Sequence, residues 1–220
     1  SKRIISWILN VDIILNNGFF DFKRRFLQSI ISQTNHLKKN IKFEKNYSKK
    51  IEILTALMLS GLVFKEYEEN YKISIKEIEN LVKNFFDKDG FPYSRNPSDL
   101  IIFSKYLLLC KECIKDAQKY VPEFLDNIIE KNLICIKNIL TPDNEVPLFN
   151  GSVKEDLGEF DKFLKNLDNK VKNKKNLIGG IQLLKYKNSL VFFDVGQPPS
   201  KNFSKNYQSG PLSFEYYLDN

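Results

Sequence analysis

The hydrophobic pattern of this chain changes its period once, between Leu167 and Leu177. Before Leu167 the apolar residues recur at intervals of three and four, which is the spacing of amphipathic helices. After Leu177 they alternate with polar residues, which is the spacing of half-buried strands. The pattern predicts a mainly α fold with a β part. We expect one helical domain over 1–170 and the start of a second, β-rich domain over 177–220.

Five helices of the first part are placed by their apolar faces and by residues suited to cap them. The predicted segments are 22–41, 47–67, 74–86, 99–117 and 123–140. We expect Ser48, Ser74 and Ser98 to cap the second, third and fourth segments. A sixth, more polar helix is expected over 153–167. Because the connections are short, the helices are predicted to form antiparallel pairs, stacked into a solenoid or a toroid.

The closing segment is interpreted as three strands. Two of them flank Lys187–Asn188, which is a hairpin signal. The third runs over 210–220, with Leu212, Phe214 and Tyr216 on one face. These strands leave edges without partners, so we expect the β domain to be truncated and the chain to be a fragment of a longer protein.

Composition narrows the classes of partner and cofactor. The 34 Lys and Arg residues exceed the 27 Asp and Glu residues, which gives a net charge of +7. The excess is mostly Lys spread along helices, which is typical of solvated helix faces, so no nucleic-acid partner is predicted. No apolar run is long and unbroken enough to span a bilayer. The thiols of Cys110, Cys113 and Cys135 are expected in or near the core, and no metal or other cofactor is predicted.

Four motifs occur in the order "DGFPYSRNPSDLI", "PLFNG", "FFDVGQPP" and "SGPLSFEYYL". Together they resemble the heparinase II/III-like superfamily, and most of all its uncharacterised bacterial branch, over about 22–220. The resemblance implies an incomplete (α/α) toroid followed by the first strands of a β-sandwich. It also implies metal-independent β-elimination on an acidic, uronate-containing polysaccharide. The implied location is the cell envelope or periplasm.

Such a lyase needs a group that neutralises the uronate carboxylate, a base for the C5 proton and an acid for the leaving oxygen. Arg95 is the candidate neutraliser, because a guanidinium binds a carboxylate bidentately. The alternative is a salt bridge or a clamp on carbonyl groups that holds its own loop. Asn96 is either a second neutraliser or a turn and cap residue. Tyr93 is either the phenol that transfers protons or a packing aromatic.

Three further residues are candidates for substrate binding. Asn150 either contacts substrate or forms the turn before Gly151. Gln208 is able to hydrogen-bond a sugar hydroxyl, although it stands where family lyases often have His. Asp99 and Leu100 stand where those lyases often have Tyr-His. By this resemblance the usual catalytic set is incomplete.

Several functions therefore stay open at this stage. The chain is a lyase with a different set of catalytic residues, a glycan-binding or envelope-biogenesis protein that does not cleave, or a scaffold. A helical-repeat interaction module is disfavoured, because it would not need a β domain. Asp194 is interpreted as a structural residue at the end of a strand, and His36 as a surface or packing residue.

Overall fold

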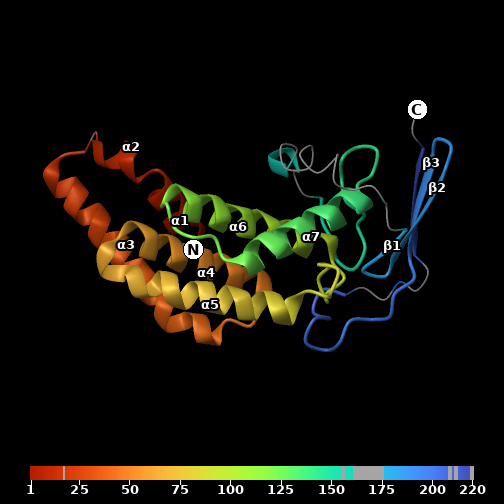
Figure 1. Ribbon diagram of the computed structural model, residues 1–220, viewed down its shortest axis with the longest axis horizontal. Coiled ribbons are helices and arrows are strands. Elements are labelled where there is room, and N and C mark those ends of the chain that lie inside the picture. The colour runs from red at the N-terminus through yellow and green to blue at the C-terminus, as the bar shows by residue number, and fades with distance from the viewer. Residues whose placement is uncertain (17, 155–156, 161–175, 208–209, 211–212, 219–220) are drawn as a thin grey trace. The chain divides into compact units, whose positions relative to one another are not determined.

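The computed structural model describes residues 1–16, 18–154, 157–160, 176–207, 210 and 213–218 of the 220-residue chain. Helices come first along the chain and strands last (Figure 1). The α-helices are α1 (Lys2–Leu9), α2 (Val11–Asn16), α3 (Phe20–Asn40), α4 (Tyr47–Val63), α5 (Glu68–Phe85), α6 (Pro97–Asp116) and α7 (Glu123–Ile139). Three 3-10 turns are η1 (Ile41–Phe43), η2 (Lys65–Tyr67) and η3 (Gly158–Phe160). The five predicted main helices are confirmed as α3 to α7, whereas most of the predicted sixth helix lies outside the described residues.

The predicted capping residues were wrong. Asn46 caps α4, because its side-chain oxygen accepts the N–H of Lys49 at 3.0 Å. Asn96 takes this place at α6 and accepts the N–H of Ser98 at 2.8 Å, with Pro97 as the first helical residue. In both helices an asparagine stands just upstream of the serine and reaches the free N–H groups first.

The helix α5 begins well before the cap that was predicted for it. Its first turn carries Glu68 and Glu69, which favour a helix N-terminus electrostatically. Ser74 lies inside the helix and is buried. The turn η2 leads directly into α5, so the start of the helix is not set by a serine.

The chain forms two compact units. The first contains Ser1–Leu81 and Tyr106–Pro122, and the second contains Val82–Lys105 and Glu123–Asn220. In the first unit α4 is buried around most of its circumference, from Ile51 to Gly61. The domain division at 170–177 stays a prediction.

The second unit contains a four-stranded antiparallel sheet in the order β1-β2-β3-β4. The strands are β1 (Leu177–Ile178), β2 (Ile181–Tyr186), β3 (Ser189–Asp194) and β4 (Phe214–Leu218). The predicted hairpin turn is confirmed, because Tyr186 pairs with Ser189 and Lys187 has a φ of 50°. The predicted third strand is confirmed as β4.

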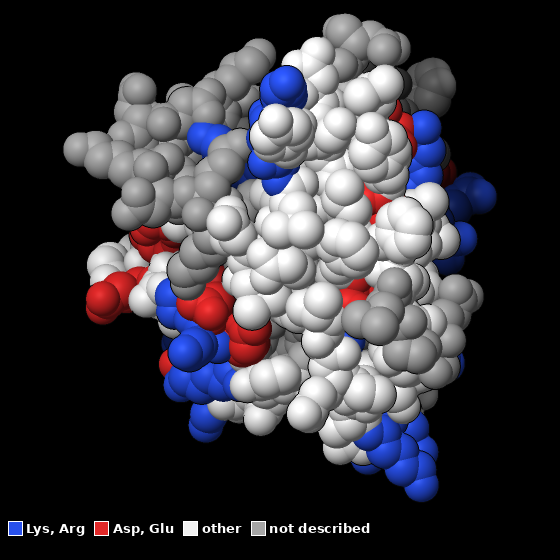
Figure 2. Space-filling model, turned by 90° about the vertical axis from the view of Figure 1, so that its right-hand side faces the viewer, with Lys and Arg blue, Asp and Glu red and all other residues white. Residues whose placement is uncertain are grey.

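The two faces of this sheet differ in burial. Ile181 and Phe192 on one face are almost fully buried. The register places a second set of apolar residues on the other face, each more than half exposed: Leu184, Tyr186, Phe214, Tyr216 and Leu218. Figure 2 shows that the side of the molecule turned toward the viewer is largely uncharged. We call the five exposed apolar residues of this sheet the open sheet face.

Candidate functional site

The segment between α5 and α6, residues 86–96, is a chain of tight turns. The Oδ1 atom of Asp87 accepts the N–H groups of Asp89 and Phe91, each at 2.9 Å. The N–H of Tyr93 donates to the carbonyl of Phe85 at 2.8 Å. The N–H of Arg95 donates to the carbonyl of Pro92 at 2.9 Å, which closes a β-turn. Asp, Gly and Pro are the residues that favour such turns, so the sequence of this segment explains its local shape.

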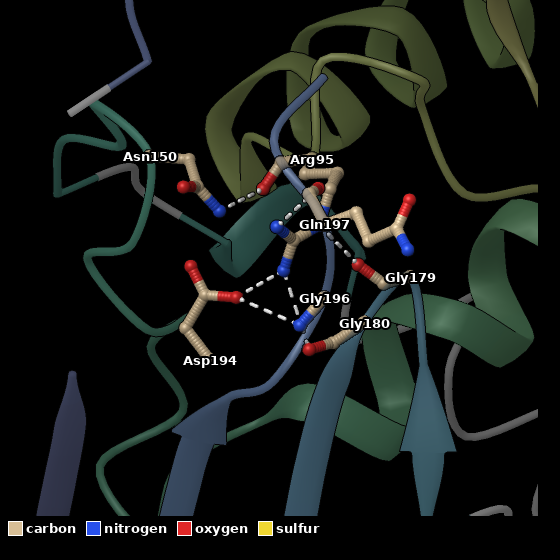
Figure 3. A network of polar contacts seen from close by, with 7 residues as sticks. All are labelled: Arg95, Asn150, Gly179, Gly180, Asp194, Gly196 and Gln197. Carbon is tan, nitrogen blue, oxygen red and sulfur yellow. Dashed lines mark hydrogen bonds and ion pairs between the residues drawn. The ribbon is translucent and has the colours of Figure 1, made fainter. Parts of the chain in front are cut away.

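Arg95 is the centre of a polar network that joins this segment to the sheet (Figure 3). Its Nε donates to the carbonyl of Gly179 at 3.0 Å, and its Nη1 donates to the carbonyl of Gln197 at 2.9 Å. Its Nη2 donates to the carbonyl of Gly180 at 3.2 Å and forms an ion pair with the carboxylate of Asp194. A guanidinium has five N–H donors, so these contacts use most of its capacity. Arg95 is 8% exposed and Asp194 is 6% exposed.

The network depends on close approach of the backbone. A Cβ atom at Gly196 would lie 2.4 Å from Cζ of Arg95. Only glycine leaves room for the guanidinium at that position. Arg95 therefore occupies a socket formed by the β1–β2 turn and the chain that follows β3.

The side chain of Asn150 forms a hydrogen bond with the backbone of Arg95. Its Nδ2 donates to the carbonyl of Arg95 at 3.0 Å. Asn150 is 4% exposed, and its Oδ1 has no hydrogen-bond partner among the described residues. Arg95 and Asn150 both have a φ of 56°, a left-handed conformation that is unfavourable for arginine and better tolerated by asparagine.

Asn96 and Asp99 shape the start of α6. Asn96 is 3% exposed and caps the helix, as described above. The carboxylate of Asp99 accepts a hydrogen bond from the hydroxyl of Ser94 at 2.7 Å. Leu100, which stands where the resemblance led us to look for a proton-transferring residue, is fully buried. The capping contact of Asn96 fits its interpretation as a turn and cap residue.

A pocket of about 670 Å³ lies within the second unit, beside Arg95. Its volume falls in the range of small-molecule sites. Its lining comes from the 87–95 segment, the β1–β2 turn and the chain after β3. The described lining residues are Asp87, Asp89, Pro92, Tyr93, Arg95, Leu177, Gly179, Gly180, Gly196, Gln197, Pro198, Pro199, Ser200 and Phe203.

An aromatic pair forms one wall of this pocket. The rings of Tyr93 and Phe203 lie 5.6 Å apart between centroids, and Tyr93 is 46% exposed. Such a pair offers an apolar surface, and the phenol adds a polar tip. Sequence reasoning missed Phe203, because an isolated phenylalanine in a polar stretch carries no signal of its partner. It also missed Asp87, although the Asp-x-Asp-Gly pattern indicated a turn there.

The structure brings some of the predicted site residues together. Tyr93 and Arg95 line the same pocket, and Asn150 contacts the backbone of Arg95. Asn96, Asp99 and Asn150 are not among the described lining residues. Gln208 lies outside the described residues. In the part of the chain that the structure describes, no group of three or more His, Cys, Asp and Glu side chains is placed to hold a metal ion.

The family follows from comparison of the whole chain with known proteins. Residues 14–177 match the family described as Heparinase II/III N-terminus. The chain belongs to this family. Membership in the heparinase II/III-like group, which the four motifs led us to expect, is thereby confirmed. No functionally curated protein matches the sequence.

Solved structures of heparinases share the fold of this heparinase-family chain. Heparan sulfate lyase HepC from Pedobacter heparinus is 17% identical, with a TM-score of 0.67, and the match covers 90% of this chain and 35% of that one. A heparinase III structure with methylated lysines is 18% identical, with a TM-score of 0.74, and the match covers 99% and 38%. A further heparinase III is 15% identical, with a TM-score of 0.74, and the match covers 99% and 40%.

These comparisons establish the fold class. Helices of an incomplete (α/α) toroid are followed by strands of a β-sandwich, as the resemblance implied. The chain spans 35–40% of the length of these heparinases. None of the helices in the described part of the chain is long and apolar enough to cross a membrane.

Proposed function

We propose that this chain is part of a heparinase-like polysaccharide lyase and binds its glycan substrate. The reaction is β-elimination on an acidic, uronate-containing polysaccharide of the cell envelope or of the extracellular space. The observation that carries the proposal is the pocket of about 670 Å³, with its Tyr93–Phe203 wall, on a heparinase fold. The flat C–H face of a sugar ring packs on an exposed aromatic ring, and carboxylate, carbonyl and hydroxyl groups of the lining accept or donate to its hydroxyls. The proposed location is the cell envelope or periplasm.

In this proposal Tyr93 is the residue that transfers protons. Its side chain is half exposed and lines the pocket, so its hydroxyl is accessible to a bound sugar. A phenol serves as an acid toward the leaving glycosidic oxygen. Asn150 and Gln208 are kept as proposed substrate contacts beyond the described lining.

The geometry of Arg95 favours its structural alternative. Most of its donors are committed to Gly179, Gly180, Gln197 and Asp194. A uronate carboxylate would have to displace these partners before the guanidinium could bind it bidentately. We therefore propose Arg95 as a positioning residue that fixes one wall of the pocket.

A second candidate function is glycan binding without cleavage. It is favoured by the commitment of Arg95 within the protein and by the fully buried Leu100 at the place where family lyases often have His. Binding needs only the pocket and its aromatic wall. Cleavage also needs a neutraliser for the uronate carboxylate.

The two functions are separated by incubating the full-length protein with a panel of uronate polysaccharides. Formation of unsaturated uronate products is followed by absorbance. We expect product with the wild type and a rate lower by about 10²–10⁴-fold for Tyr93→Phe, which keeps the ring and removes the hydroxyl. Tyr120→Phe is the matched control, because Tyr120 is 81% exposed and does not line the pocket. Binding without product supports the second function, and neither binding nor product overturns both.

A further inference from the structure

The charge of the pocket carries information about the sugar that enters it. Its described lining includes two aspartates, Asp87 and Asp89, and one arginine, Arg95. The positive charge of Arg95 is balanced by the buried carboxylate of Asp194. Among the described residues the carboxylate of Asp87 has no such counter-charge, and it accepts hydrogen bonds only from the backbone N–H groups of Asp89 and Phe91.

The second oxygen of Asp87 is free to bind a ligand. Both backbone contacts use Oδ1, and Oδ2 makes no hydrogen bond among the described residues. The two contacts also fix the orientation of the carboxylate, since they tie it to the turns of the chain that follows it. A fixed carboxylate on the wall of a pocket attracts a cation and repels an anion.

The described lining is therefore better suited to a cationic sugar than to a uronate. A uronate would place its own carboxylate near Asp87, and Arg95 is already occupied. A sugar with an ammonium group would form a charge-assisted hydrogen bond with Oδ2 of Asp87 and would pack its ring on Tyr93 and Phe203.

We propose that this pocket binds an amino sugar residue whose nitrogen is unsubstituted, and that Asp87 recognises its ammonium group. The inference rests on the proposed glycan-binding function and narrows it: the acidic polysaccharide carries free amino sugars next to its uronates, and this pocket holds the amino sugar. The uronate that undergoes elimination is then the next residue of the polymer, and Tyr93 acts on the glycosidic oxygen that joins the two sugars.

The test uses one polymer in two forms. A polysaccharide of alternating glucuronate and N-acetylglucosamine is compared before and after alkaline removal of its acetyl groups. Binding to the full-length protein is measured by titration calorimetry. We expect the form with free amines to bind at least about tenfold more tightly, which is the effect of one charge-assisted hydrogen bond. The net charge of the chain is +7, so general electrostatic attraction favours the N-acetylated form, which is the more negative polymer. A preference for the form with free amines therefore has to come from a specific contact.

Two variants assign the preference to the pocket. Asp87→Asn removes the charge but keeps a side-chain oxygen for the N–H groups of Asp89 and Phe91. We expect it to bind both forms of the polymer equally. Glu130→Gln removes an exposed carboxylate elsewhere in the same unit and is expected to keep the preference.

The outcomes separate this inference from the function on which it rests. Equal binding of the two forms by the wild type overturns the inference and leaves the glycan-binding function standing. A preference that survives in Asp87→Asn also overturns it. If neither form binds and no polysaccharide of the panel is cleaved, both proposals fail.

Discussion

Arg95 combines two unfavourable features in one residue. Its backbone is left-handed, and its charged group is almost fully buried. Strained backbone and buried charge persist only where the surroundings hold them firmly. Here the contacts to Gly179, Gly180 and Gln197, together with the ion pair to Asp194, supply that support.

Removal of the Arg95 side chain tests this structural role. Arg95→Ala leaves the carboxylate of Asp194 buried without a counter-charge, so we expect the free energy of unfolding to fall by about 3–5 kcal/mol. Urea unfolding followed by circular dichroism measures it. Arg95→Met combined with Asp194→Leu is expected to be less destabilising than Arg95→Ala alone. Unchanged stability with loss of polysaccharide cleavage would instead identify Arg95 as the carboxylate neutraliser.

Glu52 is a second buried charge, in the first unit. Burial alone would raise its pKa above the ordinary 4.5, but hydrogen bonds from Ser1 and Tyr106 and the positive charge of Lys49 outweigh it and lower the pKa. The hydroxyl of Tyr106 donates to Glu52 at 3.1 Å. A lowered pKa in the folded state stabilises the fold above pH 4.5, and this contribution is lost as the pH falls through the folded-state value.

The pH dependence of stability follows from this arrangement. We expect Tyr106→Phe to lower the free energy of unfolding by about 1 kcal/mol at neutral pH. The difference from wild type should shrink on acidification below the ordinary glutamate pKa of 4.5, because protonated Glu52 is a weaker acceptor. Tyr120→Phe, at an exposed residue, should change nothing at any pH. A difference that grows on acidification would contradict the role given to Glu52.

At the scale of elements, hydrophobic period is enough to place α3 to α7 and the β2–β3 hairpin. Capping is less predictable, because Asn46 and Asn96 compete with nearby serines and only local geometry decides between them. The partners of Arg95 are harder still. Three of them are backbone carbonyls, which carry no residue-type signal, and the fourth is Asp194, far along the chain. Tyr93 could be predicted as a loop residue, but its partner Phe203 could not.

The β1–β2 turn is the element on which the Arg95 socket depends. Gly179 has a φ of +56°, and a Cβ atom there would lie 2.0 Å from the ring of Phe91. Phe91 is fully buried and has no room to move away. We expect Gly179→Ala to lower the free energy of unfolding by about 2–3 kcal/mol, through strain and overpacking.

Thermal unfolding of Gly179→Ala is best compared with that of Gly210→Ala. Among the described residues, a Cβ atom at Gly210 would meet the side chain of Ser213, at 3.4 Å. That distance is ordinary van der Waals contact, so the control should unfold close to the wild-type temperature. Equal destabilisation by both variants would show that the tight packing around Gly179 does not limit stability.

At the scale of the whole molecule, the two units share two helices. The division falls within α5, after Leu81, and within α6, after Lys105. A helix propagates cooperatively along its length. We therefore expect the two units to unfold together.

Buried thiols report on each unit separately. Cys110 lies in the first unit, and burial raises the pKa of its thiol to about 12. Cys135 lies in the second unit and is 1% exposed. In a Cys113→Ser background, which removes the half-buried thiol, alkylation followed by mass spectrometry should give the same urea midpoint for both cysteines. Two separate midpoints would show that the units unfold independently.

The Arg95 network also fixes an order of events in folding. Its partners follow Arg95 in the sequence by 84, 85, 99 and 102 residues. During synthesis the segment 86–96 leaves the ribosome long before the β-turn that holds it, so its final shape waits for the second half of the chain. Contacts between such distant residues tend to form late, after the entropy of closing the intervening loop has been overcome. Arg95→Ala should then accelerate unfolding much more than it slows refolding, which stopped-flow measurements in urea would show directly.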